Sequence, residues 1–135
     1  MTNNIQPDVW GPPGWKFIHF VALGYPDNPS EETKKHYQEF FESIQFILPC
    51  QRCATHYQQN IQRVPISKYL KDRETLMRWT IDLHNEVNKQ RQKPILTYDE
   101  ALKLYTERQY PVLSTLWKPG ILILLLIAIY MYFVR

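Results

Sequence analysis

Hydrophobic residues recur at spacings of three and four between Trp10 and Leu104, and this period is typical of amphipathic helices. We expect the first helix to begin at Pro12 and Pro13, because proline suits a first helical turn. The side that it turns inward then carries Trp15, Ile18, His19 and Ala22. Almost no segment alternates between hydrophobic and polar residues as a half-buried strand does. The pattern therefore predicts an all-α protein.

Capping residues mark where three further helices begin, and a proline marks the start of a fourth. Ser30 and Asp72 are suitable N-caps, and Thr97–Glu100 reads as a capping box. Pro49 interrupts the second helix, so a third begins near Cys50, and Lys93–Pro94 ends the fourth. The hydrophobic positions at helical spacing in these helices are Tyr37, Phe40, Phe41, Ile44, Ile47, Leu48, Ala54, Tyr57, Ile61, Leu76, Trp79, Leu83, Val87, Ala101 and Leu104. Short links between such helices predict a compact four- to five-helix bundle.

The chain closes with an uncharged hydrophobic run from Ile121 to Val134, followed by Arg135. As a helix the run covers roughly 21 Å, less than the ~30 Å hydrocarbon core of a bilayer. Trp117 and Lys118 extend it, since both suit the membrane interface. A buried core helix is the alternative for a run of this length. We favour a C-terminal membrane anchor because the run is terminal and apolar on every side.

Length and charge narrow the classes of function. The 135 residues allow one domain with a hydrophobic core and leave no room for two. With 16 Lys and Arg against 13 Asp and Glu, the chain lacks the clustered positive charge of nucleic acid binding, so no nucleic acid partner is expected. Residues 1–8 show no secretory signal pattern. We therefore expect the domain on the cytosolic side of the membrane that the tail enters.

The two cysteines, Cys50 and Cys53, are the candidate chemical centre. Their spacing at a helix start allows an exchangeable disulfide, and the helix N-terminus together with Arg52 favours the thiolate form of Cys50. Haem attachment needs a histidine directly after the second cysteine, where Ala54 stands. Zinc held by Cys50, Cys53 and His56 is one alternative, and an inert pair of buried thiols is another.

A second polar group lies on the fourth predicted helix. His84 and Asn88 are four residues apart and share a helix face with apolar neighbours. If buried, they need hydrogen-bond partners, which either a ligand or the neighbouring backbone supplies. His19, four residues after Trp15, also needs a hydrogen-bond partner if it is buried. The chain has no glycine-rich phosphate loop, so side chains of the bundle would hold any nucleotide cofactor.

Taken together, several sequence blocks resemble the Erv/ALR sulfhydryl oxidases, which are FAD-dependent enzymes built on a helical bundle. The blocks are Trp10–His19, Pro49–Cys53, His56–Tyr57, Trp79, His84–Asn88 and Lys93–Pro94. The likeness runs from about Trp10 to Leu104 in order, and the small size resembles the minimal members encoded by large cytoplasmic DNA viruses. We divide the chain into a polar segment (1–9), an oxidase domain (10–110), a linker (111–120) and an anchor (121–135).

The resemblance implies a role for each matching residue. Cys53 would lie next to the flavin ring, and Cys50 would be the sulfur that the substrate thiol attacks. A protein dithiol would reduce this disulfide, and its electrons would pass through FAD to dioxygen, giving hydrogen peroxide. The residues that the resemblance places against FAD are Gly11, Trp15, His19, Tyr57, His84, Asn85, Val87, Asn88 and Lys93, and it implies no metal.

The chain also departs from its apparent family. Longer relatives carry a second cysteine pair that shuttles electrons to the site, whereas this chain has no further cysteine, so a separate thiol–disulfide relay protein is the expected partner. A structural disulfide of many relatives would match Ile81 and Tyr98, and Arg91 and Gln92 stand where relatives often have Leu and Gly.

Family members are commonly homodimers, and we expect one here. The expected location is a membrane, with a viral membrane or virion included. A different class of function stays open at this point, namely a membrane-tethered interaction module in which Cys50, Cys53 and His56 hold a structural metal.

Overall fold

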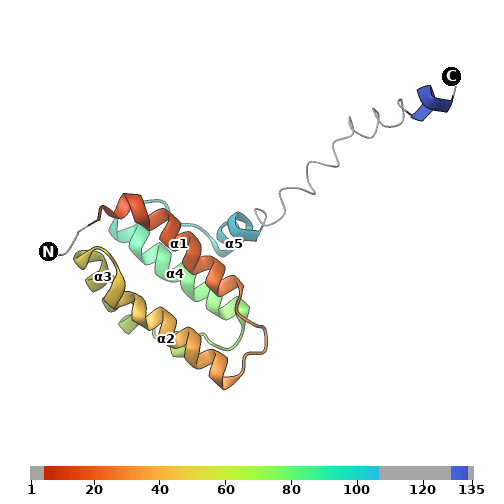
Figure 1. The fold of residues 1–135 in the computed structure, drawn as a ribbon. Coiled ribbons are helices and arrows are strands. Elements are labelled where there is room, and N and C mark those ends of the chain that lie inside the picture. Colours follow the sequence, from red (N-terminus) through yellow and green to blue (C-terminus); the bar gives the residue numbers. More distant parts are fainter. Residues whose placement is uncertain (1–4, 107–128, 134–135) are drawn as a thin grey trace. The chain divides into compact units, whose positions relative to one another are not determined.

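The computed structural model describes residues 5–106 and 129–133, and every regular element within these ranges is helical (Figure 1). The elements are α1 (Pro7–Leu23), α2 (Glu31–Ile47), α3 (Gln51–Arg63), the 3-10 helix η1 (Ile66–Lys68), α4 (Arg73–Gln90) and α5 (Tyr98–Thr106). The predicted all-α class is confirmed for this part of the chain. Residues 1–101 form one compact unit and residues 102–135 another. Within the first unit α1 packs along α4, and α2 packs along α3 (Figure 1).

The start of α1 differs from the prediction. The helix begins at Pro7, five residues before Pro12, and both Pro12 and Pro13 lie inside it. Pro7 occupies the first helical position, where its missing N–H would be unpaired in any case. The indole N–H of Trp10 donates to the carbonyl of Ile5 (3.2 Å) and fastens this early turn. Three of the four residues predicted to face inward, Ile18, His19 and Ala22, are buried, whereas Trp15 is half-buried.

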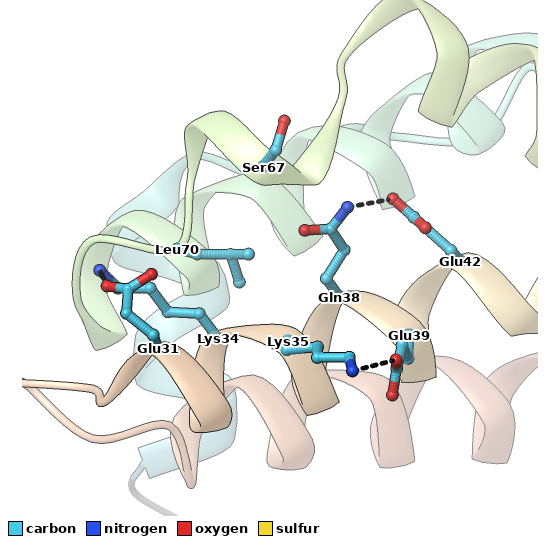
Figure 2. Close-up of a pocket in the computed structure, with 8 residues that line it drawn as sticks. All are labelled: Glu31, Lys34, Lys35, Gln38, Glu39, Glu42, Ser67 and Leu70. Atoms are coloured by element: carbon cyan, nitrogen blue, oxygen red, sulfur yellow. Dashed lines mark hydrogen bonds and ion pairs between the residues drawn. The ribbon is translucent and has the colours of Figure 1, made fainter.

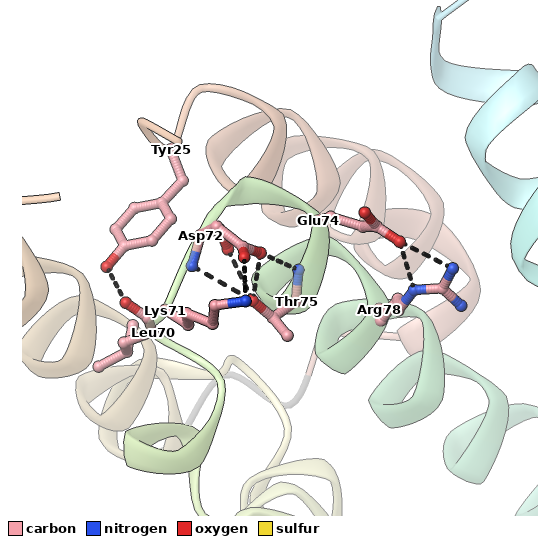
Figure 3. A network of polar contacts seen from close by, with 7 residues as sticks. All are labelled: Tyr25, Leu70, Lys71, Asp72, Glu74, Thr75 and Arg78. Carbon is pink, nitrogen blue, oxygen red and sulfur yellow. Dashed lines mark hydrogen bonds and ion pairs between the residues drawn. The ribbon is translucent and has the colours of Figure 1, made fainter. Parts of the chain in front are cut away.

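The predicted caps are all present. The Ser30 hydroxyl accepts from the Thr33 amide (3.1 Å), and the Asp72 carboxylate accepts from the Thr75 amide (2.8 Å). Asp72 and Thr75 form a full capping box at the start of α4 (Figure 3). In the same network the Tyr25 hydroxyl donates to the carbonyl of Leu70 (2.9 Å). The loop after α1 is thereby tied to the segment that leads into α4.

Phe41 and Trp79 form the centre of the hydrophobic core. Their rings meet edge to face with centroids 5.2 Å apart, and both side chains are buried. The Trp79 indole N–H donates to the carbonyl of Val64 (2.9 Å), so its polar atom is satisfied inside the core. Ile47 does not join this core, because it lies in the last turn of α2 and is 72% exposed.

The end of α4 comes earlier than Lys93–Pro94 and has a defined geometry. The helix ends at Gln90, and the amides of Gln92 and Lys93 bond back to the carbonyls of Lys89 (3.1 Å) and Asn88 (2.8 Å). This pair of bonds is a Schellman motif, which places the residue after the C-cap in the left-handed region. Gln92 occupies that position with φ of 54°. A glycine would adopt this backbone without steric strain.

Most of the predicted linker (111–120) and anchor (121–135) lies outside the described residues. Residues 129–133 are helical. No helix within residues 5–106 or 129–133 has the length and hydrophobicity of a membrane span.

Replacing Gln92 by Gly is expected to stabilise the protein by about 0.5–1 kcal/mol, because it removes Cβ strain but adds entropy to the unfolded chain. Thermal denaturation measures the gain as a rise of a few degrees in Tm. The matched control is Gln92→Ala, which keeps the Cβ and should give no such rise. Equal Tm values for the two variants would contradict the strain assigned to this position.

Candidate active site

The cysteine pair lies at the junction of α2 and α3. Proline disfavours the helical conformation of the residue before it, and Leu48 is accordingly extended, so α2 ends at Ile47. Cys50 is the N-cap of α3, and its sulfur accepts from the amide of Cys53 (3.2 Å). The two cysteines form a disulfide with Cα atoms 5.2 Å apart. The sequence prediction of a disulfide at a helix start is met by this geometry.

The two half-cystines differ in exposure. Cys50 is 5% exposed, whereas Cys53 is half-buried. The amide of Ile5 donates to the carbonyl of Pro49 (3.0 Å), so the segment before α1 lies against the residue that precedes Cys50. The disulfide is therefore next to the N-terminal end of α1.

A metal at this position receives no support from the geometry. Both sulfurs belong to the disulfide, and thiolates rather than disulfides ligate zinc. Across residues 5–106 and 129–133, no group of three or more His, Cys, Asp or Glu side chains could hold a metal ion. The alternative of a metal-holding interaction module is not favoured.

Two histidines from α1 and α4 meet inside the first unit. Nε2 of His19 lies 3.0 Å from Nδ1 of His84, and Nδ1 of His19 lies 3.1 Å from the Thr80 hydroxyl. The Trp15 ring stacks on the His84 ring with centroids 4.2 Å apart and planes 7° from parallel. The sequence left a ligand or the backbone as partners for these histidines, and the structure shows that each one partners the other.

Burial keeps both imidazoles neutral. Burial, with a smaller contribution from neighbouring His84, lowers the pKa of His19 to about 3. Burial, with a smaller contribution from the positive charge of Lys93, lowers the pKa of His84 to about 4. Each neutral ring therefore offers one N–H donor and one acceptor nitrogen near pH 7.

One face of α1 has the features that a flat cofactor needs. Gly11, Trp15 and His19 are spaced by four residues and so share a side of the helix. Gly11 is buried, yet a Cβ built on it meets no heavy atom within 4 Å. Open space beside a buried helical glycine, next to stacked aromatic rings, fits the ring systems of FAD.

Two of the predicted cofactor-binding residues, Asn85 and Tyr57, use their polar side-chain groups in hydrogen bonds to the protein backbone. The Asn85 side chain both donates to the carbonyl of Leu96 (2.8 Å) and accepts from its amide (3.1 Å), so it holds the segment after α4. The Tyr57 hydroxyl donates to the carbonyl of Phe41 (2.8 Å), and burial raises the pKa of this phenol. Their backbone and ring atoms are the parts left to contact a cofactor.

The remaining predicted residues gather at the end of α4. Val87 and Asn88 are half-buried, and the Schellman motif brings the Lys93 amide back to the Asn88 carbonyl. Asp8 on α1 pairs with Arg91 (2.6 Å) and lies 3.6 Å from the Lys93 ammonium, and the Arg91 guanidinium is the main cause of the lowered pKa of Asp8. These contacts place Lys93 near the N-terminal end of α1.

Thr80 and Asn60 are polar core residues that the sequence analysis did not single out. Thr80 is fully buried and lies one turn before His84, a spacing of four that could have identified it. Asn60 is 2% exposed, and its Nδ2 has no hydrogen-bond partner among the described residues. It lines a cavity of about 380 Å³ between α3 and α4, together with Trp79, Asn85 and others.

A second hollow of about 380 Å³ lies between α2 and η1 (Figure 2). Its charged side chains pair with one another, as in Lys34–Glu31 (2.6 Å) and Lys35–Glu39 (3.8 Å). None of the predicted site residues lines it. We therefore place the candidate site at the disulfide and the α1–α4 face.

The fold and site define a helical bundle with a disulfide at the start of α3 and stacked aromatic rings between α1 and α4, and comparison with known proteins agrees. The family model of the Erv1 / Alr family matches residues 13–111. The chain therefore belongs to this family, which confirms the resemblance drawn from the sequence blocks.

Several relatives carry the same enzyme name. The chain is 46% identical over 100 residues to the "Probable FAD-linked sulfhydryl oxidase" of Acanthamoeba polyphaga mimivirus, covering 73% of this chain and 70% of the relative. It is 32% identical over 105 residues to a "Putative FAD-linked sulfhydryl oxidase" of Invertebrate iridescent virus 6, covering 74% and 95%. The crystal structure of the yeast Erv1 core superposes with a TM-score of 0.70 at 29% identity, covering 75% of this chain and 84% of that one.

The histidine pair should make the fold sensitive to mild acid. The folded-state pKa values of His19 (about 3) and His84 (about 4) lie below the unfolded value of 6.5, so the unfolded chain binds more protons between these limits. The contribution of the neutral histidine pair to the free energy of unfolding is complete above pH 6.5 and is lost as the pH falls toward 4. Between pH 6.5 and 5 we expect the free energy of unfolding to drop by about 2 kcal/mol, with allowance for the partial exposure of His84.

Urea denaturation at these two pH values measures the effect. The control is a double variant, His19→Asn with His84→Asn, which should be less stable overall but nearly insensitive to pH in this interval. A wild-type chain that is equally stable at both pH values would refute the assigned pKa values.

Proposed function

We propose that this chain is an FAD-linked sulfhydryl oxidase that forms disulfides in protein substrates. The observation that carries the proposal is the Cys50–Cys53 disulfide at the start of α3, in a chain that belongs to the Erv1 / Alr family. The matched viral relatives are named as FAD-linked sulfhydryl oxidases. The helical bundle supplies the scaffold that holds this disulfide at the start of α3.

The proposed reaction begins at Cys50. A substrate thiolate attacks the Cys50 sulfur, the Cys50–Cys53 bond breaks, and Cys53 leaves as a thiolate. A second substrate thiolate then attacks the substrate sulfur of the mixed disulfide, which releases Cys50. The substrate has lost two electrons and two protons, and the cysteine pair has gained both. The amides of the first turn of α3, including the Cys53 amide that donates to the Cys50 sulfur (3.2 Å), stabilise negative charge there.

Residues of α1 and α4 would hold the cofactor. The stacked rings of Trp15 and His84 offer a flat apolar surface, Gly11 leaves room beside α1, and Lys93 brings a positive charge that suits phosphate groups. His19, Tyr57, Asn85, Val87 and Asn88 would complete the surroundings. When bound, FAD supplies the two-electron acceptor that returns the cysteines to the disulfide, with dioxygen reduced to hydrogen peroxide.

The proposed partners follow from the sequence. Cys50 and Cys53 are the only two cysteines, so electrons must arrive from a dithiol on another chain, and we assign that role to a separate thiol–disulfide relay protein. The proposed assembly is a homodimer, which rests on the family resemblance.

The proposed location is a membrane, cellular or viral, with the oxidase domain on its cytosolic side. The support for it is the uncharged apolar run from Ile121 to Val134 in the sequence.

Changing Cys53 to Ser is expected to lower oxygen consumption with a dithiol substrate by about 1,000-fold or more, because the disulfide cannot form. The purified variant should remain yellow and helical, which separates loss of chemistry from loss of folding. Thr55→Ala is the matched control, because Thr55 is exposed on the same helix and should leave turnover unchanged. A colourless wild-type protein would refute the cofactor assignment, and full turnover in Cys53→Ser would refute the role of the cysteine pair.

Deleting residues 121–135 should move the protein from the membrane fraction to the supernatant after cell lysis and centrifugation. The reason is that ~0.8 kcal/mol of membrane affinity is lost with each buried CH₂ group. Oxygen consumption per bound FAD should stay within about twofold of the full chain. A full-length protein already in the supernatant would refute the anchor.

A further inference from the structure

Thr80 occupies a place in the hydrogen-bond chain that the proposed mechanism has not used. It is fully buried on α4, and its hydroxyl lies 2.8 Å from the carbonyl of Met77 and 3.1 Å from Nδ1 of His19. A carbonyl oxygen only accepts hydrogen bonds, so the single hydroxyl proton is donated to Met77. The Met77 sulfur, 3.7 Å from the same hydroxyl, is also only an acceptor. The Thr80 oxygen can therefore only accept from His19.

This direction fixes the protons on both histidines. Nδ1 of His19 must carry a hydrogen to donate to Thr80, and because the ring is neutral its Nε2 carries a lone pair. That nitrogen lies 3.0 Å from Nδ1 of His84, which must then be the donor. A neutral His84 with its proton on Nδ1 has a lone pair on Nε2. The chain thus runs from His84 through His19 and Thr80 to the carbonyl of Met77.

The outer end of this chain is Nε2 of His84, a residue of the candidate cofactor site. Nε2 of His84 has no hydrogen-bond partner among the described residues, and the ring is only half-buried. The Trp15 ring stacked on it at 4.2 Å holds the plane of the imidazole and with it the direction of this lone pair. The nitrogen is therefore placed to accept a hydrogen bond from a hydroxyl or amino group of a ligand.

We infer that Thr80 is a positioning residue for the cofactor site, because it sets the tautomers of His19 and His84 so that His84 presents an acceptor nitrogen to a donor group of FAD. The inference rests on the proposed function for the identity of that ligand. Without the Thr80 hydroxyl the chain could reverse, with Nε2–H of His19 donating to His84 and a proton placed on the outer nitrogen. A ligand donor group would then meet an N–H instead of a lone pair, which is unfavourable.

The test compares the full-length wild type with Thr80→Val, which keeps the shape but removes the hydroxyl, and with Thr80→Ser, which keeps the hydroxyl. Two-bond ¹H–¹⁵N NMR correlations show directly which ring nitrogen of each histidine carries its proton, with or without FAD. We expect the proton on Nδ1 of both histidines in the wild type and in Thr80→Ser. In Thr80→Val we expect a proton on Nε2 of His84 in a substantial share of molecules. FAD affinity should fall about tenfold in Thr80→Val and stay within about twofold in Thr80→Ser.

A wild-type spectrum with the proton on Nε2 of His84 overturns the inference even if Thr80→Val does not fold. Unchanged tautomers or unchanged FAD affinity in a folded Thr80→Val overturns it as well. The tautomers are measured without cofactor, so they are independent of the proposed function. A wild type that has the expected tautomers but binds no FAD would refute the proposed function, and with it the ligand assigned to His84.

Discussion

The hydrogen bond between two neutral imidazoles, His19 on α1 and His84 on α4, is the contact on which the candidate site depends. A charged histidine at either position would be poorly solvated in this interior, so the pair is stable only while both rings stay unprotonated. The bond fixes the register of α1 against α4, which in turn places Gly11 and Trp15 beside the end of α4. The candidate site for a flat ligand lies where these polar side chains join the two helices.

The position of the reactive disulfide follows from a separate constraint, the backbone of Pro49. Because Leu48 cannot continue the helix, the chain turns and begins α3 with Cys50 as its cap. The sulfur that caps the helix is also the sulfur on which exchange is proposed. Helix capping and thiol chemistry therefore use the same group, since both depend on the unpaired amides of a first helical turn.

Local sequence signals predicted much of the fold. Ser30, Asp72 and Thr97 cap their helices as expected, because capping depends on residues within one turn of each other. The early start of α1 was missed, since tertiary contacts of the first residues decide whether a helix continues through Pro12. The early end of α4 was missed because nothing in the identity of Gln92 signals a left-handed residue.

The candidate site, too, was predicted from the sequence only in part. Cys50, Cys53, His19 and His84 were identified from spacing and family resemblance, and the last two do come together in space. The sequence could not predict the hydrogen bonds that join residues of different segments. The bond between the two histidines, and the engagement of Asn85 with Leu96, depend on how α1, α4 and the following segment pack.

The way α5 begins has a consequence for the conditions that the fold tolerates. Tyr98, the first residue of α5, is joined to α4 by noncovalent contacts. Its hydroxyl donates to the Asp82 carboxylate (2.6 Å), and the Arg78 guanidinium lies 4.6 Å from its ring centre. Neither contact contains a bond that thiols can reduce. Substrate thiols or glutathione can therefore reduce the Cys50–Cys53 disulfide without breaking the contacts that hold α5 to α4. The bonds that maintain the fold at this point are separate from the bond that takes part in thiol exchange.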